Sequence, residues 1–197
     1  MALRRAVFID KDGTLVEDVP YNVDPDRIRL APGAGEALGA LVAAGFELVV
    51  VSNQPGVALG KFIEGALRLV ETRIRGLLAP YGVPIAAFQW CPHHPEGRVR
   101  GYDVACTCRK PRPGLLQTAA AKRGLDLTQS WMVGDILDDI EAGRRAGCRT
   151  ILLDVGHETE WEPGAMREPH HKARDLREAA ALIVSAGAAY GAREALR

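Results

Sequence analysis

Three aspartates in this sequence have the spacing and surroundings of ligands for a divalent metal ion. Asp10 and Asp12 are two residues apart and directly follow the apolar run 6–9. The two-residue period of a strand can turn both towards one region. Asp135 follows another apolar run. Carboxylate oxygens are ligands that Mg²⁺ takes together with water and phosphate. Because converging acids repel one another strongly without a cation, this set predicts a divalent-metal site.

Simpler interpretations of these residues remain open. Two aspartates before Gly13 are also typical of a turn, whereas a calcium loop is disfavoured because Gly13 follows Asp12 directly. Lys110 would supply a positive partner and Ser52 a hydroxyl donor. Lysines are more often solvated and serines often belong to turns. Each such interpretation suits a single residue, whereas the joint occurrence favours one shared site.

Three of the four cysteines gather with a histidine in one stretch. Cys91 and His93 form one pair, Cys106 and Cys108 form another, and each pair has a single residue between its members. Three thiolates and an imidazole suit tetrahedral Zn²⁺. The spacer is tighter than that of zinc fingers and places the second pair poorly for a disulfide. We predict a structural zinc-binding loop over 91–108. The alternative is free buried cysteines with a surface histidine, and Cys148 is interpreted as a core residue.

Apolar runs and helix-like segments alternate along the chain. This pattern predicts an α/β fold, a Rossmann-like parallel sheet with helices on both faces. An antiparallel α+β arrangement is the alternative. The predicted strands are 6–9, 47–51, 85–90, 131–133 and 150–153, and the predicted helices are 35–44, 64–78, 114–123 and 138–146. Ligands bind at the carboxyl ends of such strands, which is where the polar residues above occur.

The remaining chain has fewer signals. Residues 156–171 read as a surface loop before a final helix over 174–185, and His157, His170 and His171 in this loop are interpreted as surface residues. No linker separates two cores, so residues 1–197 are expected to form a single domain.

Charge and composition exclude several classes of protein. There are 25 basic and 25 acidic residues and the net charge is zero, which disfavours a nucleic-acid binder or an anionic-membrane binder. The apolar run near the N-terminus is too short for a signal peptide or a membrane span. We therefore expect a cytoplasmic protein with no nucleic-acid or membrane partner. It is expected to be a monomer, because no additional apolar helix face calls for a partner.

The ordered motifs resemble a known family. The chain is similar to phosphatases of the haloacid dehalogenase superfamily over about three-quarters of its length, 7–156, through the segments 10–14, Ser52, Lys110 and 134–139. The segments 20–23, 52–58, 60–62, 91–95 and 108–111 further resemble the zinc-loop branch of that superfamily. The resemblance implies the haloacid dehalogenase fold. No insertion between Asp10 and Ser52 is large enough to form a cap domain.

The resemblance also implies roles for individual residues. Asp10 would be the nucleophile that forms an aspartyl-phosphate, and Asp12 the general acid and base. Catalytic Mg²⁺ would be held by Asp10, the backbone carbonyl of Asp12 and Asp135, with Asp139 behind the metal. Phosphate and substrate binding would fall to Ser52, Asn53, Arg109 and Lys110. The structural Zn²⁺ would be held by Cys91, His93, Cys106 and Cys108, leaving His94 as a non-ligand.

The expected substrate is a small sugar phosphate. The branch contains phosphatases that remove the 7-phosphate of D-glycero-D-manno-heptose 1,7-bisphosphate, for nucleotide-activated heptose synthesis, and phosphatases of histidinol phosphate. The segment 20–23 and the lack of a second enzyme domain favour the heptose substrate. A silent phosphometabolite-binding module is the third alternative. Lys11, Leu59 and Ile136 depart from the branch pattern, which bears on the substrate rather than on the chemistry.

Overall fold

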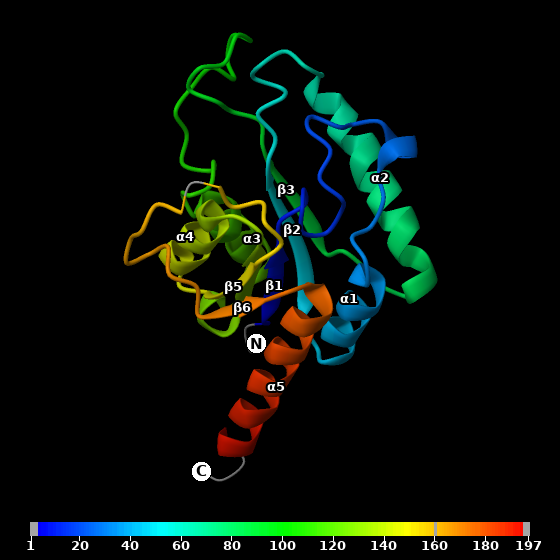
Figure 1. Cartoon of the computed structure of the whole chain (residues 1–197), viewed down its shortest axis with the longest axis vertical. Helices are drawn as coiled ribbons and strands as arrows, with labels where there is room; N and C mark the ends of the chain where they lie inside the picture. The colour runs from blue at the N-terminus through cyan, green and yellow to red at the C-terminus, as the bar shows by residue number, and fades with distance from the viewer. Residues whose placement is uncertain (1–3, 160, 195–197) are drawn as a thin grey trace.

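A six-stranded parallel sheet with the order β3-β2-β1-β4-β5-β6 forms the centre of the molecule (Figure 1). The computed structural model describes residues 4–159 and 161–194, with side chains up to Gly187. The strands are β1 Ala6–Ile9, β2 Glu47–Asn53, β3 Ala87–Cys91, β4 Trp131–Gly134, β5 Arg149–Leu153 and β6 His171–Ala173. The α-helices are α1 Ala34–Ala43, α2 Leu67–Leu78, α3 Gly114–Arg123, α4 Leu137–Ala146 and α5 Leu176–Glu194, and short 3-10 turns are Pro25–Arg27, Glu64–Ala66, Ala79–Tyr81 and Leu127–Gln129.

Helices cover both faces of the sheet because side chains alternate along the buried strands. Val7 and Ile9 of β1 face a core formed with α1, α2 and α5. Ala6 and Phe8 face the opposite core, which includes apolar residues of α3 and α4. Strand β1 is therefore apolar on both sides, as its continuous apolar run in the sequence indicated. The predicted α/β class with helices on both faces is confirmed.

Most predicted boundaries shift by one or two residues, and three differences are larger. Residues 171–173, of which the first was assigned to a loop and the other two to no element, form the edge strand β6 beside β5. Helix α5 extends to Glu194 rather than ending at 185, so Gly187 lies inside the helix. The segment predicted as one helix over 64–78 begins with a 3-10 turn, and α2 starts at Leu67.

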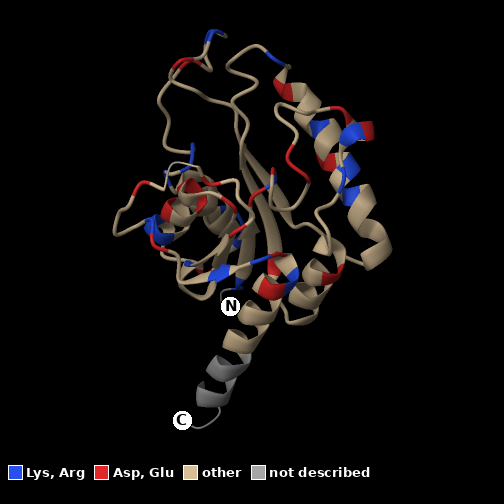
Figure 2. Cartoon of the chain, viewed as in Figure 1, with Lys and Arg blue, Asp and Glu red and all other residues tan. Residues whose placement is uncertain are grey.

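Charged residues of both signs are distributed over the helices. Figure 2 shows basic and acidic residues on both α2 and α4, which agrees with the balanced composition, and on α4 the first turn is acidic and the last turn basic. Within the described part of the chain, none of the helices is long and apolar enough to cross a membrane.

Candidate active site

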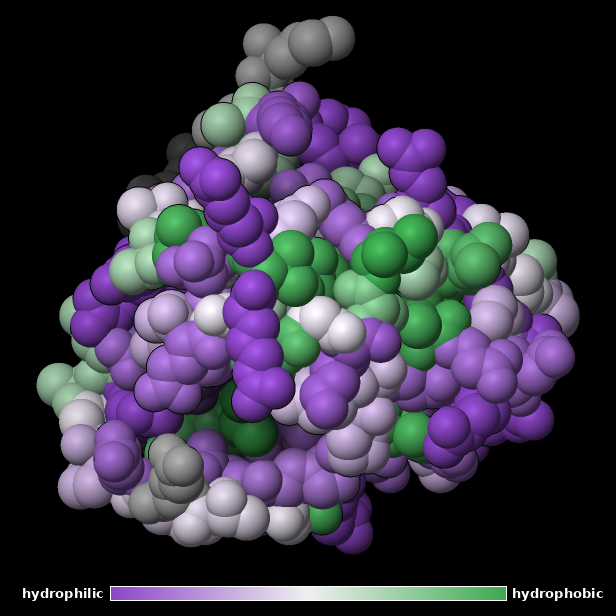
Figure 3. Space-filling model, turned by 90° about the horizontal axis from the view of Figure 1, so that it is seen from above, coloured by the Kyte–Doolittle hydropathy of each residue, from purple (hydrophilic) through white to green (hydrophobic). Residues whose placement is uncertain are grey.

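The predicted catalytic residues converge at the carboxyl edge of the sheet, which lies at the top of Figure 1. Asp10 directly follows β1, Ser52 and Asn53 end β2, and Asp135 directly follows β4. Together with Lys110 they line a cavity of about 230 Å³, whose other walls include Asp12, Asp18, Ile136 and His157. The face above this edge carries mostly hydrophilic residues, with apolar side chains gathered in patches between them (Figure 3). The fold thus brings the dispersed motifs into one cavity.

Three buried carboxylates form the centre of this site. Asp10, Asp135 and Asp139 place carboxylate oxygens within 4.8 Å of one another. Burial, and then the charge of Asp10, raise the pKa of Asp135 to about 6. Burial also raises the pKa of Asp139 well above its ordinary value. Crowded carboxylates that favour protonation gain stability from a hard cation, so this donor set fits Mg²⁺. The side chain of Asp12 lies outside the cluster, although it lines the same cavity.

Lys110 offsets part of this negative charge. Its side chain is almost fully buried, and its Nζ lies 2.5 Å from Oδ1 of Asp10 and 2.5 Å from Oδ1 of Asp139. Nζ also donates a hydrogen bond of 3.2 Å to the carbonyl of Val51. Burial alone would lower the pKa of Lys110, but the two carboxylates outweigh it and raise that pKa above its ordinary value. The lysine is therefore a fixed cation beside Asp10.

Asp12 is held by two neighbours, Lys11 and Gln54, for which the sequence predicted no role in the site. Gln54 is buried, and its Nε2 donates to Oδ2 of Asp12 at 3.0 Å and to Oγ of Ser52 at 2.9 Å. The buried ammonium of Lys11 pairs with the other carboxylate oxygen of Asp12. Burial raises the pKa of Asp12, although Lys11 opposes the shift. The raised pKa favours the protonated form that a general acid requires.

The loop that carries Lys110 is fixed to the end of β2. Oδ1 of Asn53 accepts from the backbone N–H of Lys110, and Nδ2 of Asn53 donates to its carbonyl, both at 3.0 Å. Asn53 therefore acts on the backbone of this loop. Arg109 lines a neighbouring cavity of about 320 Å³ together with Arg112, and its Nη1 is buried without a hydrogen-bond partner among the described residues. Asn53 and Arg109 thus connect the catalytic cavity with the adjoining loop.

The four predicted zinc ligands form a compact cluster. Sγ of Cys108 lies 3.2 Å from Sγ of Cys91, 3.3 Å from Sγ of Cys106 and 3.4 Å from Nδ1 of His93. Tetrahedral zinc–sulfur bonds of about 2.3 Å place sulfurs somewhat less than about 4 Å apart, so the donor set fits one Zn²⁺. Hydrogen bonding to Cys91 lowers the pKa of the Cys108 thiol to about 5. His94 lies outside the cluster, and its Nδ1 accepts from the N–H of Glu96.

Gly134 leaves space for the buried acid cluster. A Cβ at this position would lie 2.2 Å from Oδ2 of Asp139, whose carboxylate is fixed against Lys110. We expect Gly134→Ala to lower the free energy of unfolding by about 1–3 kcal/mol, as overpacking does, and to reduce turnover. Gly76→Ala is the matched control, because nothing lies within 4 Å of its added Cβ inside α2. That change should raise stability by about 0.5–1 kcal/mol in urea unfolding. Equal effects of the two changes would contradict the steric explanation.

His157 has an acidic partner that the sequence did not signal. It is exposed, as expected of a surface residue, but its Nδ1 lies 2.7 Å from Oδ2 of Asp135. The other carboxylate oxygen of Asp135 accepts from Oγ1 of Thr14 at 3.0 Å. The contact with His157 joins residues 22 positions apart, and no local spacing signals it. Thr14 and Gln54 could have been predicted as site residues, because each belongs to the polar segment that follows a strand.

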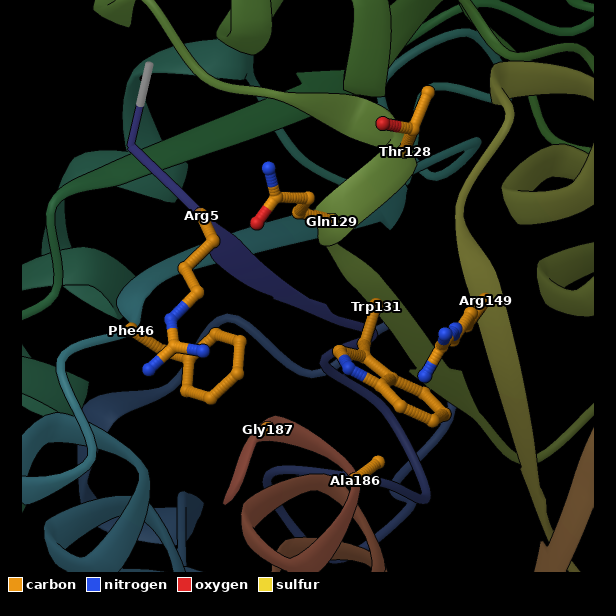
Figure 4. Close-up of a pocket in the computed structure, with 8 residues that line it drawn as sticks. All are labelled: Arg5, Phe46, Thr128, Gln129, Trp131, Arg149, Ala186 and Gly187. Carbon is orange, nitrogen blue, oxygen red and sulfur yellow. The ribbon is translucent and has the colours of Figure 1, made fainter. Parts of the chain in front are cut away.

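A smaller pocket at the opposite edge of the sheet is unrelated to this chemistry. Its volume is about 40 Å³, and it is lined by Arg5, Phe46, Thr128, Gln129, Trp131, Arg149, Ala186 and Gly187 (Figure 4). The guanidinium of Arg5 lies 4.3 Å from the ring centre of Phe46, and that of Arg149 lies 5.4 Å from the ring centre of Trp131. Among the residues that the structure describes, no carboxylate, thiol or histidine lines this pocket, so it lacks the groups that the predicted chemistry needs.

Comparisons with known proteins agree with this geometry. A HAD-hydrolase-like family model matches residues 107–179. D-glycero-beta-D-manno-heptose-1,7-bisphosphate 7-phosphatase of Escherichia coli (strain K12) is 38% identical over 148 residues, which cover 75% of this chain and 78% of that protein. A HAD-like phosphatase of Mesorhizobium loti has a TM-score of 0.80 and 33% identity, covering 93% of this chain and 87% of that one. The D,D-heptose 1,7-bisphosphate phosphatase of B. bronchiseptica, solved with magnesium and phosphate, has a TM-score of 0.75 and 29% identity, covering 92% of this chain and 98% of that one.

The sequence relatives and the solved structures both cover most of the chain. The chain therefore belongs to the haloacid dehalogenase superfamily, as a hydrolase of phosphoric monoesters similar to the heptose 1,7-bisphosphate phosphatases.

Proposed function

We propose that residues 1–197 form one Mg²⁺-dependent phosphatase domain that removes the 7-phosphate of D-glycero-D-manno-heptose 1,7-bisphosphate through an aspartyl-phosphate. The observation that carries this proposal is the buried Asp10 carboxylate, paired with Lys110 at 2.5 Å in a cavity that also holds Asp12 and Asp135. The substrate assignment is supported by relatives of that activity at 38% and 41% identity, the second from Haemophilus ducreyi. The product would feed nucleotide-activated heptose synthesis.

In the first step a carboxylate oxygen of Asp10 attacks the phosphorus atom. The bond between phosphorus and the sugar oxygen breaks as the bond to Asp10 forms, and Asp12 donates its proton to the departing alkoxide. Lys11 and Gln54 hold Asp12 in place for this transfer. The products of the step are the free sugar hydroxyl and the phosphorylated Asp10.

In the second step Asp12, now a carboxylate, removes a proton from water. The resulting hydroxide attacks the phosphorus, and the bond to Asp10 breaks, releasing inorganic phosphate and restoring both acids. Ser52 and Lys110 would bind the phosphoryl oxygens. Mg²⁺, held by Asp10, Asp135 and the backbone carbonyl of Asp12, would offset the charge on the nucleophile and the phosphate. Asp139 would support the metal site from behind through its contact with Lys110.

Two adjoining cavities offer room for the rest of the substrate. One, of about 270 Å³, includes Tyr21 and Asn22 and shares Asp12 and Asn53 with the catalytic cavity. The other, of about 320 Å³, shares Lys110 and carries the cations of Arg109 and Arg112. Guanidinium groups bind phosphate oxygens in a bidentate manner, so the second phosphate of a bisphosphate would bind on this cationic side.

The zinc cluster would stabilise the loop that positions these cations. Cys108 immediately precedes Arg109, and the backbone N–H of Arg109 donates to Sγ of Cys106 at 3.3 Å. Zinc held by three thiolates needs reduced cysteines, and all four cysteines of the chain are unpaired thiols. We therefore place this enzyme in the reducing cytoplasm.

Phosphate release from three substrates tests this function. Heptose 1,7-bisphosphate, histidinol phosphate and fructose 1,6-bisphosphate are compared with and without Mg²⁺, with Asp10→Asn as the background. We expect Mg²⁺-dependent turnover, with kcat/KM for the heptose at least tenfold above the other two, a discrimination of about 1.4 kcal/mol. Preference for histidinol phosphate would overturn the substrate, whereas absence of Mg²⁺-dependent hydrolysis of any of them would overturn the catalytic proposal.

A further inference from the structure

The imidazole of His157 contacts the carboxylate proposed to bind Mg²⁺. Its Nδ1 lies 2.7 Å from Oδ2 of Asp135, while Thr14 donates to Oδ1 of the same residue. An ionised carboxylate can only accept, so Nδ1 carries the hydrogen of this bond. Each oxygen of Asp135 thus has one side-chain donor, and each keeps lone-pair capacity for a cation. The two donors fix the carboxylate against rotation.

The segment that carries His157 is attached to the same turn through its next residue. Oε2 of Glu158 accepts from the backbone N–H of Leu137 at 2.6 Å, at the first position of helix α4. An acidic side chain is favourable at a helix N-terminus, where backbone N–H groups lack partners within the helix. His157 therefore contacts Asp135, and its neighbour Glu158 contacts Leu137. The contact of Glu158 holds the backbone of this segment where His157 can reach Asp135.

Gly13 packs against the imidazole of His157. This residue has φ +74°, and a Cβ there would lie 2.5 Å from Nδ1 of His157 and 2.2 Å from Oδ2 of Asp135. The backbone of the turn after β1 therefore packs directly against the hydrogen bond between the two side chains. His157 also lines the catalytic cavity, although its side chain remains 39% exposed.

From these contacts we propose that His157 is a positioning residue that orients Asp135 for Mg²⁺. The inference rests on the metal site of the proposed function. Groups that hold a metal ligand in its binding orientation typically contribute a factor of roughly 10 to 100 to metal affinity. His157 acts through Asp135 rather than on the substrate. Its loss should therefore weaken Mg²⁺ binding much more than it slows turnover at saturating metal.

Calorimetric titration of the intact protein with Mg²⁺, without substrate, tests this role. Bound Mg²⁺ is removed by dialysis rather than by a chelator, so that the zinc cluster is left intact. We expect His157→Ala to raise the Kd for Mg²⁺ at least tenfold. His157→Asn should restore most of the affinity, because its amide nitrogen replaces Nδ1 as the donor. His170→Ala is the matched control, since this histidine of the same loop contacts Thr150 instead.

Turnover as a function of Mg²⁺ gives a second readout. The alanine variant should need at least tenfold more Mg²⁺ for half-maximal rate, while kcat at saturating Mg²⁺ stays within about threefold of the unmodified enzyme. An unchanged or lower Kd for Mg²⁺ in His157→Ala would overturn the inference and leave the phosphatase proposal intact. Weakened binding together with no turnover of the heptose substrate would support the inference while removing the substrate assignment.

Discussion

Asp10→Asn is expected to abolish turnover, with kcat reduced by at least ~10³-fold at saturating substrate and Mg²⁺. The amide is a poor nucleophile and cannot form the aspartyl-phosphate. The side chain keeps its size, so the cavity that it lines with Asp12 and Lys110 should keep its shape. Lys110 also retains Asp139 as an ionic partner. The measurement is phosphate release under single-turnover and steady-state conditions.

A control substitution of aspartate by asparagine far from the cavity distinguishes a loss of catalysis from a loss of folding. Asp126→Asn alters an acid that caps the 3-10 turn Leu127–Gln129, at the edge of the sheet opposite the cavity. Asparagine keeps an oxygen that can accept from the backbone N–H of Thr128. This control should retain full activity. Substantial turnover by folded Asp10→Asn protein, above a tenth of the unmodified rate, would contradict the nucleophilic role.

Cys108→Ser is expected to release the proposed zinc and to inactivate the enzyme. Its Sγ lies within 3.4 Å of three other donor atoms of the cluster, so this change removes a ligand that contacts all the others at short distance. Metal binding supplies folding energy directly, and its loss should lower stability by about 3 kcal/mol or more. For a chain of this length that lowers Tm by roughly 6–12 °C. Activity should fall at least tenfold, because Lys110 is only two residues away.

Cys148 offers the control for this experiment. It is the one cysteine outside the cluster, and its buried thiol packs in the core beside α3 and α4. Cys148→Ala should destabilise the fold modestly through the small cavity that it leaves, while keeping one zinc per chain. Zinc content by atomic absorption, together with thermal unfolding, checks both variants. Equal zinc content in Cys108→Ser and unmodified protein would contradict the assigned ligand set.

The elements that position the site were largely predictable, because continuous apolar runs mark buried parallel strands. The strand Ala6–Ile9 and the helix Gly114–Arg123 have the predicted bounds, and the polar residues at the ends of β1, β2 and β4 line one cavity with Lys110. Strand β6 was missed because two of its three residues, His171 and Lys172, are exposed and only Ala173 is buried. An edge strand this short carries no apolar run that the sequence could reveal.

Other features could not be predicted because they depend on tertiary contacts. Helix α5 continues through Gly187, which resembles a helix stop in the sequence but lies near Arg5 in the folded chain. His157 and Asp135 are neighbours only because the loop after β5 returns to the end of β4. A histidine in a polar loop resembles a solvated residue as long as the position of its partner in the fold is unknown. The sequence therefore predicted which acids, lysine and cysteines come together better than it predicted the side chains that contact them.

The direction of α5 has a practical consequence for handling the enzyme. The helix begins beside the catalytic edge, where Leu176 packs in the core, and runs back past the opposite edge of the sheet (Figure 1). By Ala186 and Gly187 it already lines the pocket at that far edge. An enzyme tethered to a bead or electrode through the far end of this helix would therefore present its open cavity to the surrounding solution. Immobilisation at that end should leave substrate diffusion unhindered.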